Sequence, residues 1–180
     1  MAKYILGKQS QNRNTIIRYT AVIGFYLFLL AIVQTSVLAV KKPFGGVPDL
    51  LLSTVLCISL YCGCYAGAVT GIAAGFLTDA IGTVGLSILP LVYFLVAYFF
   101  GYYTKVLGVR GYLTYLIGVG ISLPVRLIAT LIQSVVATDG LRGGVFMTAT
   151  ALPELLGTLL FSLILYFPAK WISQWLKKRG

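Results

Sequence analysis

The stretch LLLSTVLCISLYCGCYAGAVTGIAAGFLTD, residues 50–79, decides the fold class. Its first 29 residues, 50–78, carry no charge, and Asp79 ends the run. As a single α-helix these residues would be about 43 Å long at about 1.5 Å per residue, whereas the hydrocarbon core of a bilayer is about 30 Å thick. The stretch is therefore either one strongly tilted helix that crosses a membrane once, or two short helices joined in a hairpin.

The composition of the chain indicates a membrane protein. Of its 180 residues 59% are hydrophobic and only 10% are charged, which no soluble domain resembles. The net charge of +10 would suit nucleic acid, but the basic residues are spread between apolar runs and form no patch. We therefore expect no nucleic-acid partner, and we interpret the basic residues as markers of membrane topology.

The charges of the loops favour the hairpin, because cytoplasmic loops retain Lys and Arg. A hairpin gives six transmembrane helices with both termini in the cytoplasm, ten basic residues inside and three outside, while a single crossing leaves five inside and eight outside. In the six-helix topology the inner residues are Lys3, Lys8, Arg13, Arg18, Lys105, Arg110, Lys170, Lys177, Lys178 and Arg179, and the outer ones are Lys41, Lys42 and Arg142. A re-entrant hairpin would keep the same sidedness.

These patterns predict an all-α fold, a single integral membrane domain over residues 1–180. A cytoplasmic tail, 1–18, precedes the first helix, which is too long for a cleaved signal sequence. The six helices are predicted at about residues 19–40, 50–62, 64–79, 86–104, 112–138 and 145–167. After Pro168, the segment 169–180 is predicted to be an amphipathic helix on the cytoplasmic membrane surface.

Glycines recur every fourth residue in the hairpin. Gly63 falls in its turn, and Gly67, Gly71 and Gly75 share one face of the following helix. Such small residues form a shallow groove that lets another helix approach closely. The approaching helix is either another helix of this chain or the transmembrane helix of a partner.

Two charged residues lie well inside apolar segments. Arg126 precedes Gly140 by 14 residues and Glu154 follows it by 14, so an antiparallel hairpin with its turn at Gly140 brings them to the same depth. An isolated charge in the membrane is costly, so we predict that they pair. The pair is either structural or the lining of a polar cavity, and a charge exchange between the two positions should restore function only if it is structural.

Two acidic residues lie near predicted helix ends. Asp49, after Pro48, suits an N-terminal cap of the helix that follows, and the alternative is a binding role. Asp79 is expected at the outer end of its helix, in solvent or bound to a donor. Aromatic residues crowd the fourth predicted helix and are expected to contact lipid or the interface, or to form a platform for a partner: Tyr93, Phe94, Tyr98, Phe99, Phe100, Tyr102 and Tyr103.

The sequence lacks the parts of an enzyme. It has no histidine, its four acidic residues are scattered, and it has no Gly-Lys-Ser/Thr phosphate loop. Cys57, Cys62 and Cys64 are expected to be small packing residues and not metal ligands. We expect no enzymatic activity, no cofactor and no metal.

Four short motifs resemble those of the rod shape-determining protein MreD family. They are VQTSVL at 33–38, PDLLL at 48–52, GIAAGFLTDAIG at 71–82 and LVYFLVAYFFGYY at 91–103. Their order and spacing in a six-helix chain of this size carry the resemblance, which covers the first four helices. The residues that carry it are Gln34, Pro48, Asp49, Gly75, Phe76 and Asp79.

The resemblance implies a bacterial cell-membrane protein with no catalytic activity that takes part in cell-wall elongation and the regulation of cell shape. Its implied partners are an MreC-like single-pass membrane protein, an MreB-like cytoskeleton and wall synthases, besides membrane lipid. The alternative is a substrate-binding subunit that resembles the S-components of energy-coupling-factor vitamin transporters. S-components typically have small residues on the first helix, whereas GFYLFLLAIVQ at 24–34 is bulky.

Overall fold

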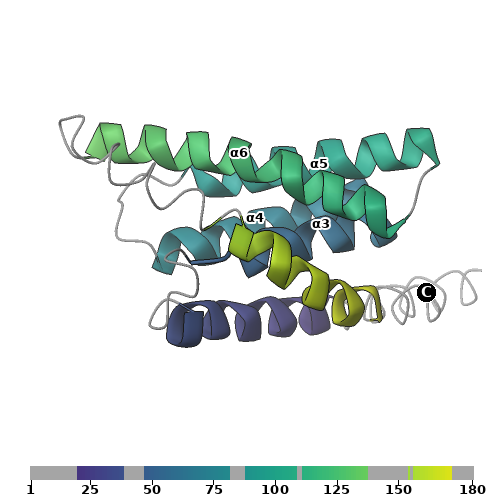
Figure 1. Ribbon diagram of the computed structural model, residues 1–180, viewed down its shortest axis with the longest axis horizontal. Coiled ribbons are helices and arrows are strands. Elements are labelled where there is room, and N and C mark those ends of the chain that lie inside the picture. Colours follow the sequence, from purple (N-terminus) through teal and green to yellow (C-terminus); the bar gives the residue numbers. More distant parts are fainter. Residues whose placement is uncertain are drawn as a thin grey trace, which may run out of the picture.

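A computed structural model of the chain describes residues 20–38, 47–81, 88–108, 111–137, 154 and 156–171. Within these residues the fold is all helical, with no strand, as the sequence predicts. The first helix, Thr20–Ser36, passes into a π-helical turn, η1 (Gln34–Leu38). The others are α3 (Leu50–Cys62), α4 (Cys64–Ile81), α5 (Leu89–Leu107), α6 (Tyr112–Ala137) and a last helix, Leu156–Trp171. Most of them run along the long axis of the molecule (Figure 1).

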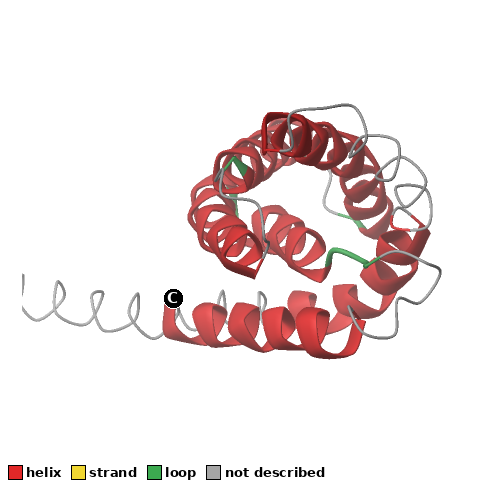
Figure 2. Ribbon diagram, turned by 90° about the vertical axis from the view of Figure 1, so that its left-hand side faces the viewer, coloured by secondary structure: helices red, strands yellow, loops and turns green. Residues whose placement is uncertain are grey.

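The helix α3 forms the centre of the bundle. Its residues from Leu50 to Leu60 are all buried, and it packs against α4, α5 and α6. A helix that is apolar on every side is stable only when other elements surround it. The end-on view shows the helices packed around one another in a single bundle (Figure 2).

The uncharged stretch 50–78 lies in two helices, as the hairpin interpretation predicts. Gly63 alone separates α3 from α4, with φ at 98°, and its N–H donates to the carbonyl of Ser59 at 3.0 Å. This backbone conformation strains any residue with a Cβ atom, so glycine suits the turn. The turn lets α4 pack back along α3.

Among the described residues, two helices are long and apolar enough to cross a membrane: α5, and α6 from Tyr112 to Ile132. Shorter apolar helices are Thr20–Ser36, Leu50–Cys62 and Leu156–Trp171. The predicted break at Pro168 differs from the structure, in which the last helix continues through it to Trp171. A proline removes one backbone hydrogen bond, and the buried side chains of Tyr166 and Ala169 hold this turn against the bundle. Most of the predicted amphipathic segment, 172–180, lies outside the described residues.

Candidate functional site

A network of polar side chains lies inside the bundle, beginning with Asp49. This residue caps α3: its Oδ1 accepts a hydrogen bond from the backbone N–H of Leu52 at 3.0 Å. Its own backbone N–H donates to Thr158 Oγ1 of the last helix at 2.9 Å. Asp49 is completely buried, so its carboxylate depends on the protein for every favourable contact.

The cation of the network is Arg126, in the middle of α6. Its Nε lies 2.8 Å from Asp49 Oδ2, and its Nη1 donates to Glu154 Oε1. The side chain of Arg126 is 11% exposed and that of Glu154 is 18% exposed. The structure thus places Arg126 and Glu154 in an ion pair, and it adds Asp49, which the sequence predicts as a helix cap and a motif residue but not as a partner of Arg126.

Tyr93 of α5 completes the network. Its hydroxyl donates to Asp49 Oδ2, and its side chain is 0% exposed. The expectation that Tyr93 contacts lipid is therefore wrong. The residues of α5 that are buried recur every three or four positions, as in Tyr93, Ala97, Gly101 and Thr104, and this periodicity was the signal in the sequence that places Tyr93 on the inner face.

Gln34 also contacts the start of α3. Its side chain is buried, and its Oε1 accepts from the backbone N–H of Leu50 at 3.2 Å. The first N–H groups of a helix have no partner within the helix. Gln34 and Asp49 supply acceptors for two of them in α3, the N–H groups of Leu50 and Leu52. Two motifs that lie apart in the sequence therefore meet at the start of the central helix, where the preceding Pro48 is also buried.

The network joins four parts of the chain: the cap of α3, α5, α6 and the last helix. Removal of one partner of a buried ion pair leaves an uncompensated charge and is strongly destabilising. Within the described residues no three metal-ligating side chains gather. The network therefore links these parts of the chain through hydrogen bonds and ion pairs.

The glycine groove of α4 is filled by the same chain. A Cβ atom at Gly71 would lie 2.7 Å from the carbonyl oxygen of Tyr93, and one at Gly75 would lie 2.3 Å from Cα of Pro90. Gly67 packs in the same way against Ser59 of α3. All three glycines are buried, so α3 and α5 occupy the groove and no partner helix fits there.

The remaining motif residues of α4 lie outside this contact. Phe76 follows Gly75 in the chain, but its side chain is exposed. Asp79 is half-buried in the last turn of α4. The structure thus separates the six motif residues into a cluster of three at the start of α3, a packing glycine, an exposed ring and a half-buried carboxylate at the end of α4.

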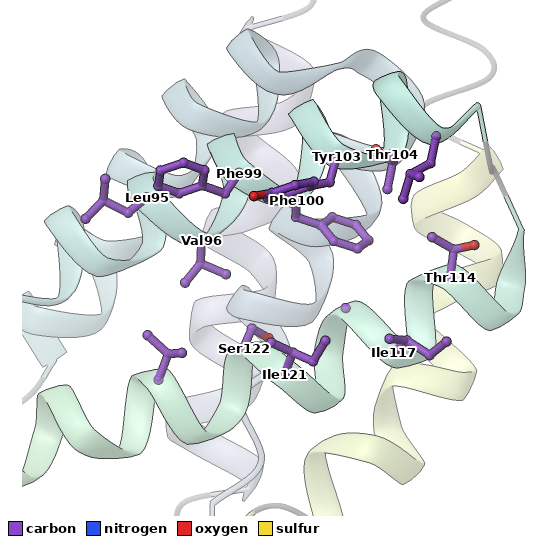
Figure 3. Close-up of a pocket in the computed structure, with 13 residues that line it drawn as sticks. Leu95, Val96, Phe99, Phe100, Tyr103, Thr104, Thr114, Ile117, Ile121 and Ser122 are labelled. Carbon is purple, nitrogen blue, oxygen red and sulfur yellow. The ribbon is translucent and has the colours of Figure 1, made fainter.

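A groove that no described helix fills lies between α5 and α6, and we call it the α5–α6 groove (Figure 3). Its volume is about 660 Å³. Leu95, Phe99 and Tyr103 of α5 face Ile117 and Ile121 of α6 across it. The rest of its lining is Val96, Phe100, Thr104, Leu107, Thr114, Gly118, Ser122 and Val125.

Two hydroxyl groups of the α5–α6 groove lining form hydrogen bonds within their own helices. Thr104 and Ser122 are buried, and their hydroxyls donate to carbonyls of their own helices, Gly101 at 3.1 Å and Val119 at 2.9 Å. The surface that the groove offers is mainly apolar, and it lies between the two described helices that are long enough to cross a membrane.

Comparison with protein families decides the family. The profile of the rod shape-determining protein MreD matches residues 15–178. The chain belongs to the MreD family. The match extends beyond the four motifs to α6 and the last helix, so it includes Arg126 and Glu154. Comparison with curated proteins and with solved structures gives no significant match.

Membership of the MreD family confirms the resemblance found in the sequence and gives the general function of the chain. MreD-family proteins are membrane proteins that determine rod shape, and the family is not an enzyme family. A role in cell shape therefore applies to this chain. The match gives no support to the alternative of a vitamin-binding transporter subunit.

Proposed function

We propose that this MreD-family chain is a non-enzymatic scaffold in the bacterial cell membrane that organises cell-wall elongation by binding the transmembrane helix of an MreC-like single-pass protein in the α5–α6 groove. An MreB-like cytoskeleton and the wall synthases would join the assembly through that partner. In this proposal six helices cross the membrane and both termini are cytoplasmic, as the distribution of Lys and Arg favours.

The observation that carries the proposal is the open apolar groove. The glycine surface of α4 is covered by α3 and α5, so a partner helix needs another place. The α5–α6 groove lies between two helices of membrane-crossing length, and the side chains of Phe99, Ile117 and Ile121 are more than half exposed in it. A helix with an apolar face binds such a groove through side chains at every third or fourth position.

Photo-crosslinking tests the groove as the partner site. A photoreactive amino acid replaces Phe99 or Ile121 in the groove, and in a control it replaces Val69, an exposed residue of α4 outside the groove. We expect adducts with the MreC-like protein from the two groove positions and none from Val69. Equal adducts from Val69, or none from a groove variant that still supports growth as rods, would contradict the proposal.

Filling the α5–α6 groove with a larger side chain tests the proposal in cells. Ile121→Trp adds an indole ring to the groove, whereas Val69→Trp adds the same ring to the surface of α4. In a strain that depends on this chain, we expect Ile121→Trp to produce rounded cells at an unchanged protein level, while Val69→Trp cells remain rods. Depletion of the whole chain without a change of shape would overturn the scaffold role itself.

A further inference from the structure

A second cavity lies at the other end of the bundle from the cap of α3. It has a volume of about 570 Å³ and is formed where α3 ends, α6 begins and the last helix ends. Tyr61 of α3, Tyr112 of α6 and Tyr166 of the last helix line it, together with Lys170. Neither the polar network nor the α5–α6 groove includes these residues.

The hydroxyl groups of this cavity can still donate hydrogen bonds. Tyr61 and Tyr166 share one hydrogen bond of 2.6 Å between their hydroxyl oxygens, and whichever oxygen accepts keeps its own proton to donate. The hydroxyl of Tyr112 is buried and has no hydrogen-bond partner among the described residues. A buried hydroxyl without a partner is unfavourable, so the cavity suits a ligand that forms a hydrogen bond with it, and the oxygen of an anion would accept its proton.

Positive charge accompanies these donors. The Nζ of Lys170 lies 5.3 Å from the centroid of the Tyr166 ring, and no described carboxylate pairs with it. Glu154 precedes it by 16 residues, about 24 Å along a helix at about 1.5 Å per residue. The first turn of α6, at Tyr112, also presents the positive end of the helix dipole. The ligand is therefore an anion.

One wall of the cavity leads to an apolar surface. Leu163 and Phe167 line it and are exposed, and Trp171, one turn further along the last helix, is exposed as well. A ligand that satisfies both walls has an anionic group and a hydrocarbon part. We propose that this cavity binds the phosphate group of an anionic phospholipid, with Lys170 and the Tyr112 hydroxyl on the phosphate and the acyl chains along Leu163 and Phe167.

Tryptophan quenching measures this binding in the full chain. The chain has two tryptophans, Trp171 and Trp175, both close in sequence to Lys170. The detergent-solubilised protein is titrated with micelles that contain brominated phosphatidylglycerol or brominated phosphatidylcholine, which quench tryptophan on contact. We expect half-maximal quenching at a several-fold lower fraction of phosphatidylglycerol than of phosphatidylcholine.

Matched variants assign the preference to the cavity. Lys170→Gln should weaken the preference for phosphatidylglycerol about fivefold, the effect of one basic residue near an anionic lipid. Tyr112→Phe, which removes only a hydroxyl, should weaken it about fivefold as well. Lys105→Gln changes an exposed basic residue in the last turn of α5 that does not line the cavity, and it should leave the preference unchanged.

Inorganic phosphate distinguishes a lipid from a soluble source of the same group. If millimolar phosphate alone shifts the tryptophan emission, and Lys170→Gln abolishes the shift, the cavity takes free phosphate as well as the lipid. If phosphate is without effect and the lipid preference depends on Lys170 and Tyr112, the ligand is the lipid. The proposal is overturned if neither response depends on Lys170, or if Lys105→Gln weakens the preference as much as Lys170→Gln.

Discussion

The contact between α4 and α5 at Gly75 gives a prediction whose size follows from the geometry. In Gly75→Ala the new Cβ would lie 2.3 Å from Cα of Pro90, whereas ordinary contacts begin at 3.4 Å. The atoms in the way belong to the backbone of α5 and cannot rotate aside, so the two helices must separate by about 1 Å. Overpacking of this kind costs about 1–3 kcal/mol, and we take about 2 kcal/mol for this site.

Thermal unfolding of the detergent-solubilised chain measures this cost. For a protein of this size 1 kcal/mol corresponds to about 2–4 °C, so Gly75→Ala should lower Tm by about 4–8 °C. Gly120→Ala is the matched control, because a Cβ atom on this exposed residue of α6 would have nothing within 4 Å. Alanine is the better helix former, so Tm should stay the same or rise slightly in the control.

Two results would refute this reasoning. If Gly75→Ala and Gly120→Ala have the same Tm, α5 does not lie against Gly75. If Gly75→Ala keeps the Tm of the parent chain but no longer supports growth as rods, the glycine groove faces a partner. The main argument for placing the partner helix in the α5–α6 groove would then no longer hold.

The polar network gives the remaining predictions, all measured as Tm in the same assay. Arg126→Gln leaves two carboxylates without their cation and should cost about 3 kcal/mol or more, whereas Glu154→Gln should cost about 1 kcal/mol because Glu154 is the more exposed end of the pair. The exchange Arg126→Glu with Glu154→Arg should not restore stability, because it places a carboxylate beside Asp49; recovery of the parent Tm would show that Asp49 does not need this cation. Tyr93→Phe removes a hydrogen bond to a carboxylate and should cost about 1.5–3 kcal/mol, while Tyr102→Phe, on the exposed face of α5, should have no effect. Equal Tm values for the two tyrosine variants would contradict the inward position of Tyr93.

The structure changes the outcome expected from exchanging the charges of Arg126 and Glu154. The equal distance of Arg126 and Glu154 from Gly140 in the sequence predicted that they pair, and the structure has an ion pair between them. The same counting gave no sign of Asp49, which is 77 residues from Arg126 in the chain. A rescue by charge exchange is expected only if the pair is isolated, and Asp49 makes it a group of three.

The helices themselves were predictable because their signals are local. The uncharged run at residues 50–78 is too long for one simple crossing, and Gly63 provides a residue that adopts the positive φ of a one-residue turn. Local signals gave no reliable end for the last helix. Pro168 looked like a stop, but tertiary packing of Tyr166 and Ala169 keeps the helix intact.

The sequence by itself determined the class of protein, the division of residues 50–79 into two helices, and the glycine surface of the second one, because these depend on composition and on the short-range periodicity of the chain. Only the tertiary structure decided what covers that surface, which way Tyr93 points and which second carboxylate binds Arg126. The physical reason is the same in each case: a glycine every fourth residue creates room for a helix without specifying which helix, and a buried charge requires a partner without specifying where in the chain it lies.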